Sequence, residues 1–221
     1  MEDGRSLWTL EMPLFGSAQT QEELEGFDLA AETRIQRLSV EDGEVVRTFS
    51  VRDVMEANPG LDIFGIHQID YDWGGSDWED DPFHLNDVEP LPAALAPAFP
   101  DFEAGDLLIS PRSLNLVAVV DPETLKIKWY DFGRMRRQHD PDWQPDGTIT
   151  VFDNSMHRPP SRILKIRPGD GAAPETTIET IVNGADHGFF TAVRGKHQVL
   201  GNGHVLVTSS QQGRVFEVDG D

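Results

Sequence analysis

The sequence predicts an all-β protein, a β-propeller whose blades are four-stranded antiparallel sheets. Its 20 glycines and 15 prolines divide the chain into short segments, and within these segments apolar and polar residues alternate as they do in strands. The same pair of strand patterns also recurs, and a repeat of about 40–50 residues with several strands is typical of a propeller blade. We expect about four blades in a single domain over residues 1–221, either as a small complete propeller or as part of a larger one.

The first repeat is expected at residues 34–49, where "RIQRLSVEDGEVVRTF" contains two alternating segments joined by an Asp-Gly turn. The opening residues 5–12 resemble a return strand of this repeat, so we expect them to pair antiparallel with residues 214–219 if the chain closes on itself. Residues 50–57, "SVRDVMEA", form the best helical pattern in the sequence.

An acidic, proline-rich segment at about residues 67–103 separates the first repeat from the others and is expected to be an insertion. Within it, "DYDWGGSDWEDDPF" (70–83) begins like a calcium-binding loop but lacks the full set of ligands and the closing glutamate. We therefore interpret this stretch as solvated.

Three later repeats each begin with a glycine turn and a strand, at "GDLLIS" (105–110), "GTITVF" (147–152) and "GNGHVLVT" (201–208). A second strand follows each of these and begins at Leu116, Arg162 and Arg214, so the repeat is 46 and then 52 residues long. The segment 121–132 adds a return strand. Blades are expected to end near residues 51, 132 and 182.

Composition excludes several functions. The 39 acidic and 18 basic residues give a net charge of -21, which repels phosphate backbones, so no nucleic-acid partner is expected. The absence of cysteine excludes disulfides, thiol nucleophiles and zinc-thiolate sites. No apolar run approaches the ~20 residues of a membrane span, and the start has no secretory core. We expect no membrane contact by this chain, and a periplasmic location only if an export signal lies upstream.

Histidines precede the first strand of three repeats. His84, His139 and His197 lie eight, six and four residues before Pro92, Pro145 and Gly201. Because these offsets differ by even numbers, the three side chains would share one face of an extended chain and point toward the central channel. Alternatively, each histidine caps a turn by bonding a carbonyl.

Other polar residues lie close to these histidines in the sequence. Arg158 has no counterpart in the other repeats and is the candidate for anion binding, whereas Arg162 matches Arg34 and Arg214 and can be a framework residue. The candidate substrate-binding residues are Arg162, Asn154 and Asn86.

At these residues the chain resembles the bacterial arylsulfotransferase family, over about residues 80–221, in "HLNDVEPLP", "QHDPDWQPDGTITVFDN", "SRILKI" and "GKHQVLGNGHVLV". The resemblance implies transfer of a sulfuryl group from a phenolic sulfate ester to a phenol through a sulfohistidine, without a cofactor or metal. It makes His197 the nucleophile, His84 and His139 supporting residues, and Arg158 the arginine that binds the sulfuryl group. The expected partners are a small aryl sulfate donor and a phenolic acceptor.

Two other functions stay open at this point. The first is a calcium-dependent propeller hydrolase of the lactonase type. The side-chain oxygen atoms that could bind the calcium ion belong to Asn86, Asp87, Asp140, Asp153 and Asn154. The chain could also be a non-catalytic propeller that binds a ligand or protein on its faces.

Overall fold

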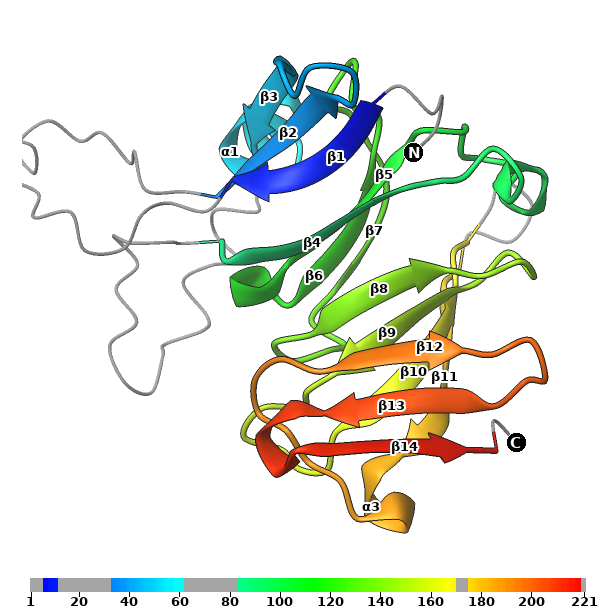
Figure 1. Ribbon diagram of the computed structural model, residues 1–221. Helices are drawn as coiled ribbons and strands as arrows, with labels where there is room; N and C mark the ends of the chain where they lie inside the picture. Colours follow the sequence, from blue (N-terminus) through cyan, green and yellow to red (C-terminus); the bar gives the residue numbers. More distant parts are fainter. Residues whose placement is uncertain (1–5, 12–32, 62–82, 170–174, 220–221) are drawn as a thin grey trace, which may run out of the picture.

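The structure, a computed structural model, describes residues 6–11, 33–61, 83–169 and 175–219. Four antiparallel sheets make up this part of the chain, and in each of them the strands follow one another in sequence order (Figure 1). The expected all-β fold is confirmed.

The first sheet contains β1 (Ser6–Glu11), β2 (Arg34–Ser39) and β3 (Val45–Ser50). The second contains β4 (Leu85–Pro90), β5 (Leu107–Pro111), β6 (Leu116–Val120) and β7 (Ile127–Phe132). The third contains β8 (His139–Trp143), β9 (Ile149–Asp153), β10 (Arg162–Arg167) and β11 (Thr177–Asn183). The fourth contains β12 (Lys196–Val199), β13 (Val205–Ser209) and β14 (Arg214–Val218). The expected blade ends near 51, 132 and 182 agree with the ends of β3, β7 and β11.

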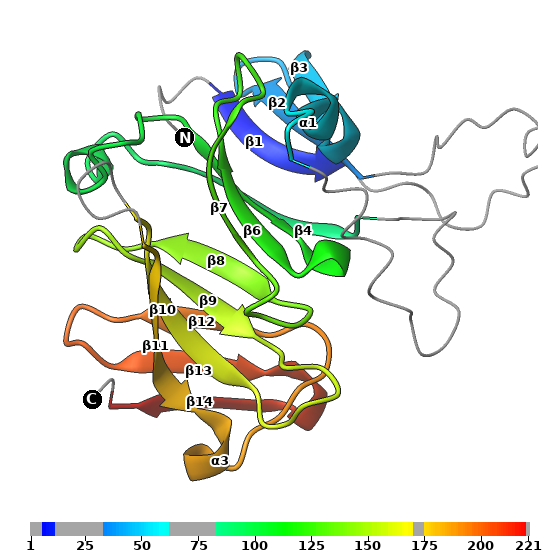
Figure 2. The same cartoon turned by 180° about the vertical axis from the view of Figure 1, so that it is seen from behind.

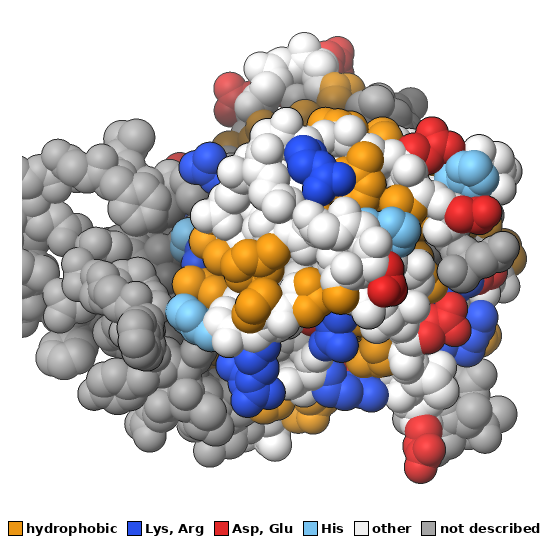
Figure 3. All heavy atoms as spheres, turned by 90° about the horizontal axis from the view of Figure 1, so that it is seen from below, with side chains coloured by type: hydrophobic (Ala, Val, Ile, Leu, Met, Phe, Trp, Pro, Cys, Tyr) orange, Lys and Arg blue, Asp and Glu red, His pale blue; other side chains and the backbone are white. Residues whose placement is uncertain are grey.

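The inner sheets are buried on both faces, which explains their nearly continuous apolar strands. In β5, Leu107 and Ile109 pack toward the first sheet, while Leu108 between them packs toward the third. Since successive side chains of a strand point to opposite faces, one strand supplies two neighbouring cores. A third core, around Phe152 and Val207, joins the third sheet to the fourth. The lower side of the molecule carries exposed hydrophobic side chains (Figure 3), and Val215 of the fourth sheet is 65% exposed.

The first strands of the four sheets lie next to one another. β1 contacts β4, β4 contacts β8, and β8 contacts β12. Figure 1 shows these strands stacked in order, with β7, β10 and β11 running behind them, and Figure 2 shows the same later strands in front. The sheets are therefore arranged like successive blades of a propeller, and the inner strands β4, β8 and β12 face a common axis.

Two expectations about organisation are wrong. β1 pairs with β2, with Ser6 opposite Ser39, and β14 pairs with β13, so within the described residues the strand 6–11 does not pair with the strand 214–218. The predicted insertion also extends too far, because residues 85–90 form β4, the inner strand of the second sheet. Its polar sequence "LNDVEP" does not show the apolar alternation of a core strand, because the strand faces the axis. Residues 62–82 lie outside the described part.

The predicted helix is confirmed as α1 (Val51–Ala57). Ser50 caps its N-terminus by accepting a hydrogen bond from the backbone N–H of Asp53, whose carboxylate in turn accepts one from the backbone of Ser50. Its apolar side bears Val51, Val54 and Met55, all buried. A second short helix, α3 (Gly184–His187), was not expected. None of the helices in the described residues has the length and apolarity needed to cross a membrane.

Candidate functional site

Equivalent residues with left-handed backbone stand just before the three inner strands. They are His84, Arg137 and Arg194, with φ angles of 44°, 56° and 62°. The hairpin registers place each of them one residue before the partner of the last residue of β5, β9 or β13. The position that repeats from blade to blade therefore carries one imidazole and two guanidinium groups, and the three histidines are not equivalent.

His139 and His197 consequently occupy different positions on their strands. His139 pairs with Phe152, whereas His197 pairs with Val207, one step further along the equivalent strand. The registers of β4 and β8 shift by a residue along their length, but that of β12 does not. Even offsets in sequence therefore do not give the expected common face, because a bulge moves every later side chain to the other face.

His139 is held by a defined set of hydrogen bonds. Its Nδ1 lies 2.6 Å from Oδ1 of Asn154 and 3.0 Å from the carbonyl oxygen of Arg137. The side-chain nitrogen of the fully buried Asn154 donates to the carbonyl oxygens of Thr191 and Arg194, which fixes Oδ1 as the atom that faces the imidazole. Two acceptors around Nδ1 require that Nδ1 carry the proton. The lone pair is then on Nε2, which accepts a long hydrogen bond, 3.3 Å, from the backbone N–H of Arg194.

Arginine charges act on this imidazole and on that of His84. Burial, followed by the charge of Arg112, lowers the pKa of His84 to about 4, with further contributions from His139 and Arg137. Burial also lowers the pKa of His139, although the hydrogen bond that Nδ1 donates to Asn154 opposes this, and Arg112 lowers it further. Both imidazoles are therefore neutral at pH 7. His84, Arg112, Arg137 and His139 are called the imidazole–arginine cluster below.

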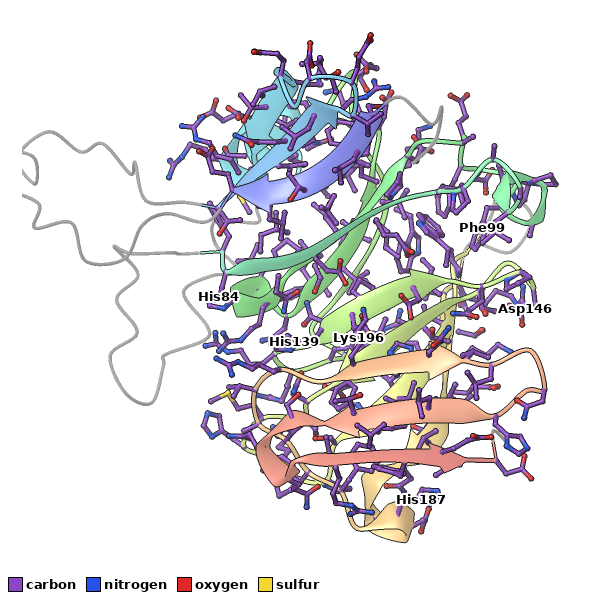
Figure 4. The ribbon with its side chains drawn as sticks, in the orientation of Figure 1. His84, Phe99, His139, Asp146, His187 and Lys196 are labelled. Carbon is purple, nitrogen blue, oxygen red and sulfur yellow. The ribbon has the colours of Figure 1, made fainter. Side chains whose placement is uncertain are left out.

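The cluster is built into the framework at the ends of the inner strands. Arg137 is only 7% exposed, its backbone N–H donates to Asn115, and its side chain donates to Ser113 Oγ at 3.1 Å. His84 and His139 lie at one end of the inner strands, whereas Asp146 lies at the opposite end (Figure 4). The charge of Arg137 is thus held in place before any ligand binds, which suits recognition of an anion.

A second group of ionisable side chains faces the axis between β4, β8 and β12. Its carboxylates are Asp87 and Glu89 of β4 and Asp140 and Asp142 of β8, called the axial carboxylates below. Mainly through burial, and secondarily through the neighbouring carboxylates, the pKa rises to about 6 in Asp87 and to about 7 in both Glu89 and Asp142. Burial would also raise the pKa of Asp140, but His197 and Lys196 outweigh it and keep that pKa low.

His197 lies against these carboxylates and apart from the imidazole–arginine cluster. Its side chain is 0% exposed, its backbone N–H donates to Asp140 Oδ2 at 2.6 Å, and its Nδ1 lies 3.2 Å from the same oxygen. Its Nε2 lies 3.8 Å from Oδ2 of Asp142. Lys196 bonds the other oxygen of Asp140.

The remaining predicted residues have separate positions. Arg158 is exposed on the loop between β9 and β10, and its guanidinium group makes no hydrogen bond or ion pair to the residues that the structure describes. Arg162 is a framework residue, because its Nε donates to Asp153 at 2.8 Å and its Nη2 donates to the carbonyl oxygen of Arg134. Asn86 links two blades by donating to the carbonyl oxygen of Gln138 at 2.8 Å.

The expected calcium ligands do not form one set. Asp153 accepts hydrogen bonds from the backbone of Arg136 and Ser155 in addition to Arg162, and Asn154 is bound to His139. The residues that approach Asp140 are Asp142 and His197, which the sequence analysis had not grouped together. It also missed Arg112, Arg137 and Glu89, although the run "HDPD" that begins β8 could have indicated that carboxylates face the axis.

The fold and the cluster together define a class of protein. It is an all-β, propeller-like protein in which neutral imidazoles and fixed arginines meet at one end of the inner strands. A family model described as Arylsulfotransferase (ASST) matches residues 3–221, and the chain belongs to that family. The match covers nearly the whole chain and supports an arylsulfotransferase-like function on small aryl sulfates and phenols. No curated protein matches the chain.

Proposed function

We propose that this protein transfers a sulfuryl group from an aryl sulfate to a phenol and that His139 carries the group between them. The observation that supports this assignment is the hydrogen bonding of the His139 ring. Nδ1–H donates to Asn154 at 2.6 Å, so the lone pair is on Nε2, and this neutral imidazole lies in the electrostatic field of Arg112. The lone pair accepts only a long hydrogen bond, 3.3 Å, from the backbone N–H of Arg194, and this bond has to break when Nε2 attacks. A neutral imidazole with an oriented lone pair is the form that attacks sulfur.

The reaction proceeds in two displacements. The Nε2 lone pair of His139 forms a bond to sulfur while the sulfur–oxygen bond to the aryl group breaks, and the phenolate leaves with the electron pair and takes a proton from solvent. The acceptor phenol then loses its proton to solvent, because the pKa of His84, about 4, makes its imidazole too weak a base to take it. The phenol oxygen bonds to sulfur, the nitrogen–sulfur bond breaks, and the electron pair returns to Nε2.

Arginine side chains stabilise the charge on the sulfuryl oxygens. Arg112 and Arg137 supply fixed positive charge beside His84 and His139. Arg158, exposed on the loop that follows Asn154, is the arginine that the family resemblance assigns to the sulfuryl group, and its exposure leaves it accessible to a ligand. Loss of one such donor costs roughly 10²–10³ in rate, which is the effect expected of Arg158→Ala.

His139 suits this role better than His197, the nucleophile implied by the resemblance. The side chain of His197 is 0% exposed, and its ring nitrogens face the carboxyl groups of Asp140 and Asp142. A sulfate ester is an anion and is repelled by such groups, whereas the arginines around His139 attract it.

The test is incubation with a chromogenic aryl sulfate, with and without an added phenol, followed by mass mapping of peptides after donor alone. We expect donor-dependent phenol release, acceleration by the acceptor, and a sulfuryl group on the peptide that contains His139. His139→Ala should abolish both signals, and His204→Ala, at an exposed histidine paired with Glu217, is the matched control.

Three results would contradict the proposal. A sulfuryl group on the peptide that contains His197 would return the role to that residue. Release that requires calcium and ignores the acceptor phenol would indicate a hydrolase. Binding of the aryl sulfate without any turnover would indicate a non-catalytic propeller.

A further inference from the structure

The axial carboxylates surround a buried imidazole that has no hydrogen-bond partner among the residues described. The side chain of His197 is 0% exposed, and neither ring nitrogen makes a hydrogen bond of acceptable geometry. A buried polar group without a partner costs roughly 1–3 kcal/mol. One ligand atom each from Asp140, Asp142 and His197 lie within 4.8 Å of one another. We propose that these three residues bind a divalent transition-metal cation between β8 and β12.

The surroundings of the two ring nitrogens of His197 explain why a cation fits. Nδ1 lies 3.2 Å from Oδ2 of Asp140, and Nε2 lies 3.8 Å from Oδ2 of Asp142. A neutral imidazole has only one N–H, so one of its nitrogens directs a lone pair at a carboxyl oxygen. Two ligands that are each about 2.0–2.2 Å from one ion lie up to roughly 4 Å apart. The separation of 3.8 Å therefore leaves space for an ion between Nε2 and Asp142.

The contacts between Asp140 and His197 resemble those that hold a metal-binding histidine in place. With Nε2 bound to the ion, Nδ1–H points toward Oδ2 of Asp140, and a carboxylate on the other ring nitrogen is a common way to fix a metal-binding imidazole. Oδ1 of Asp140, which Lys196 bonds in this structure, is then the atom proposed to bind the ion. The backbone N–H of His197 donates to the same carboxylate at 2.6 Å, which holds β12 against β8.

The local charge also favours a cation. Asp87 and Glu89 of β4 face the same space and interact electrostatically with Asp140. The cation seen there is the ammonium group of Lys196, which bonds Asp140, but its side chain is 72% exposed. A long, exposed side chain can move into solvent when a divalent ion replaces its charge.

The donor set indicates the kind of ion. Imidazole nitrogen is a good ligand for zinc and neighbouring transition metals, whereas calcium and magnesium prefer sites made of oxygen alone. One imidazole with two carboxylates therefore favours Zn²⁺ over Ca²⁺. None of the proposed ligands belongs to the imidazole–arginine cluster, although Asp140 directly follows His139 and acts electrostatically on it.

The test is calorimetric titration of the chelator-treated full chain with Zn²⁺ and, separately, with Ca²⁺. We expect one Zn²⁺ site. Asp142→Asn should weaken it about tenfold or more, because it removes a ligand from a side chain that is 28% exposed and can change without disturbing the core. Asp146→Asn is the matched control, since Asp146 pairs with Lys165 at the opposite end of the strands (Figure 4).

A second variant keeps the test decisive if Asp142→Asn folds poorly. Lys196→Ala removes the exposed competing charge and should make Zn²⁺ bind more tightly. A purely structural ion pair between Lys196 and Asp140 would produce no such gain. The proposal is overturned if the unaltered chain does not bind Zn²⁺, if Ca²⁺ binds more tightly than Zn²⁺, or if Asp142→Asn binds Zn²⁺ as well as the unaltered chain does.

Discussion

Replacement of Asn154 by alanine should separate the positioning of His139 from the stability of the blade. Asn154 is 0% exposed and makes three side-chain contacts: it accepts from His139 Nδ1 at 2.6 Å and donates to the carbonyl oxygens of Thr191 and Arg194. The alanine variant removes these three hydrogen bonds, although His139 Nδ1 keeps the carbonyl oxygen of Arg137 and the carbonyl oxygen of Thr191 keeps Ser161 Oγ. A net loss of roughly 1 kcal/mol for each hydrogen bond, partly recovered by water in the space that opens, gives about 2–3 kcal/mol.

The catalytic effect should be larger than this loss of stability suggests. Without the Asn154 oxygen, only the carbonyl oxygen of Arg137 still orients the imidazole of His139, and the loss of an orienting partner typically costs about 10–100-fold. We expect kcat to fall by that factor while KM for the aryl sulfate changes little. The assays are steady-state phenol release and thermal unfolding, with Asn202→Ala as control, because Asn202 caps an exposed turn by accepting from the backbone of His204.

The variant Asn154→Asp tests whether Asn154 orients the imidazole of His139 or only supports the fold. A carboxylate beside His139 raises the pKa of the imidazole, so the pH below which the rate declines should move upward relative to the unaltered protein. If Asn154→Ala unfolds at a lower temperature but keeps full kcat, and Asn154→Asp leaves the pH profile unchanged, then Asn154 only supports the fold.

Three further outcomes are expected. The pKa of His84 is about 4 in the folded protein against 6.5 in a model peptide, so the unfolded chain binds more protons between these two pH values. The stability of the folded protein should therefore rise with pH over this window. The variant His84→Asn should flatten this rise, which denaturant titrations at several pH values would measure. Gly195→Ala should destabilise the protein by about 2–4 kcal/mol, because the new Cβ would lie 2.7 Å from the ring of Phe152 and the residue has a φ of +120°. Gly203→Ala is the control, since Gly203 has a φ of +88° but no atom within 4 Å of the new Cβ, so this variant shows the effect of backbone strain without the clash. Arg162→Ala should cost roughly 1–3 kcal/mol in stability, since it leaves a buried carboxylate short of one partner, and a large loss of kcat instead would restore Arg162 as a substrate-binding residue.

The strand pattern of the core could be predicted from the sequence with little ambiguity. Strands β6, β10 and β14 begin at the expected residues, and α1 agrees with the predicted helix. Strands β5, β9 and β13 begin two to four residues after the start of the expected segments. These elements depend on local alternation, turn glycines and a helix cap, which are properties of neighbouring residues. The inner strand β4 was assigned to an insertion, because its residues face the axis and lack the apolar alternation of a core strand.

The pairing of β1 required the tertiary structure for a related reason. Its sequence is compatible with the edge of more than one sheet, and the partner is decided by the packing of Trp8, Ile35 and Phe49 in one core. Main-chain hydrogen bonds of a strand carry little information about which strand they will join.

The sequence by itself determined the all-β class, the repeat, the acidic charge and the family to which the chain belongs. It also identified His84, His139 and Asn154 as residues near one site. Only the tertiary structure decided that His139 lies with arginines while His197 lies with carboxylates. The physical reason is the register shift in β4 and β8: a single extra residue reverses the face of every side chain beyond it, and this depends on pairing with the neighbouring strand.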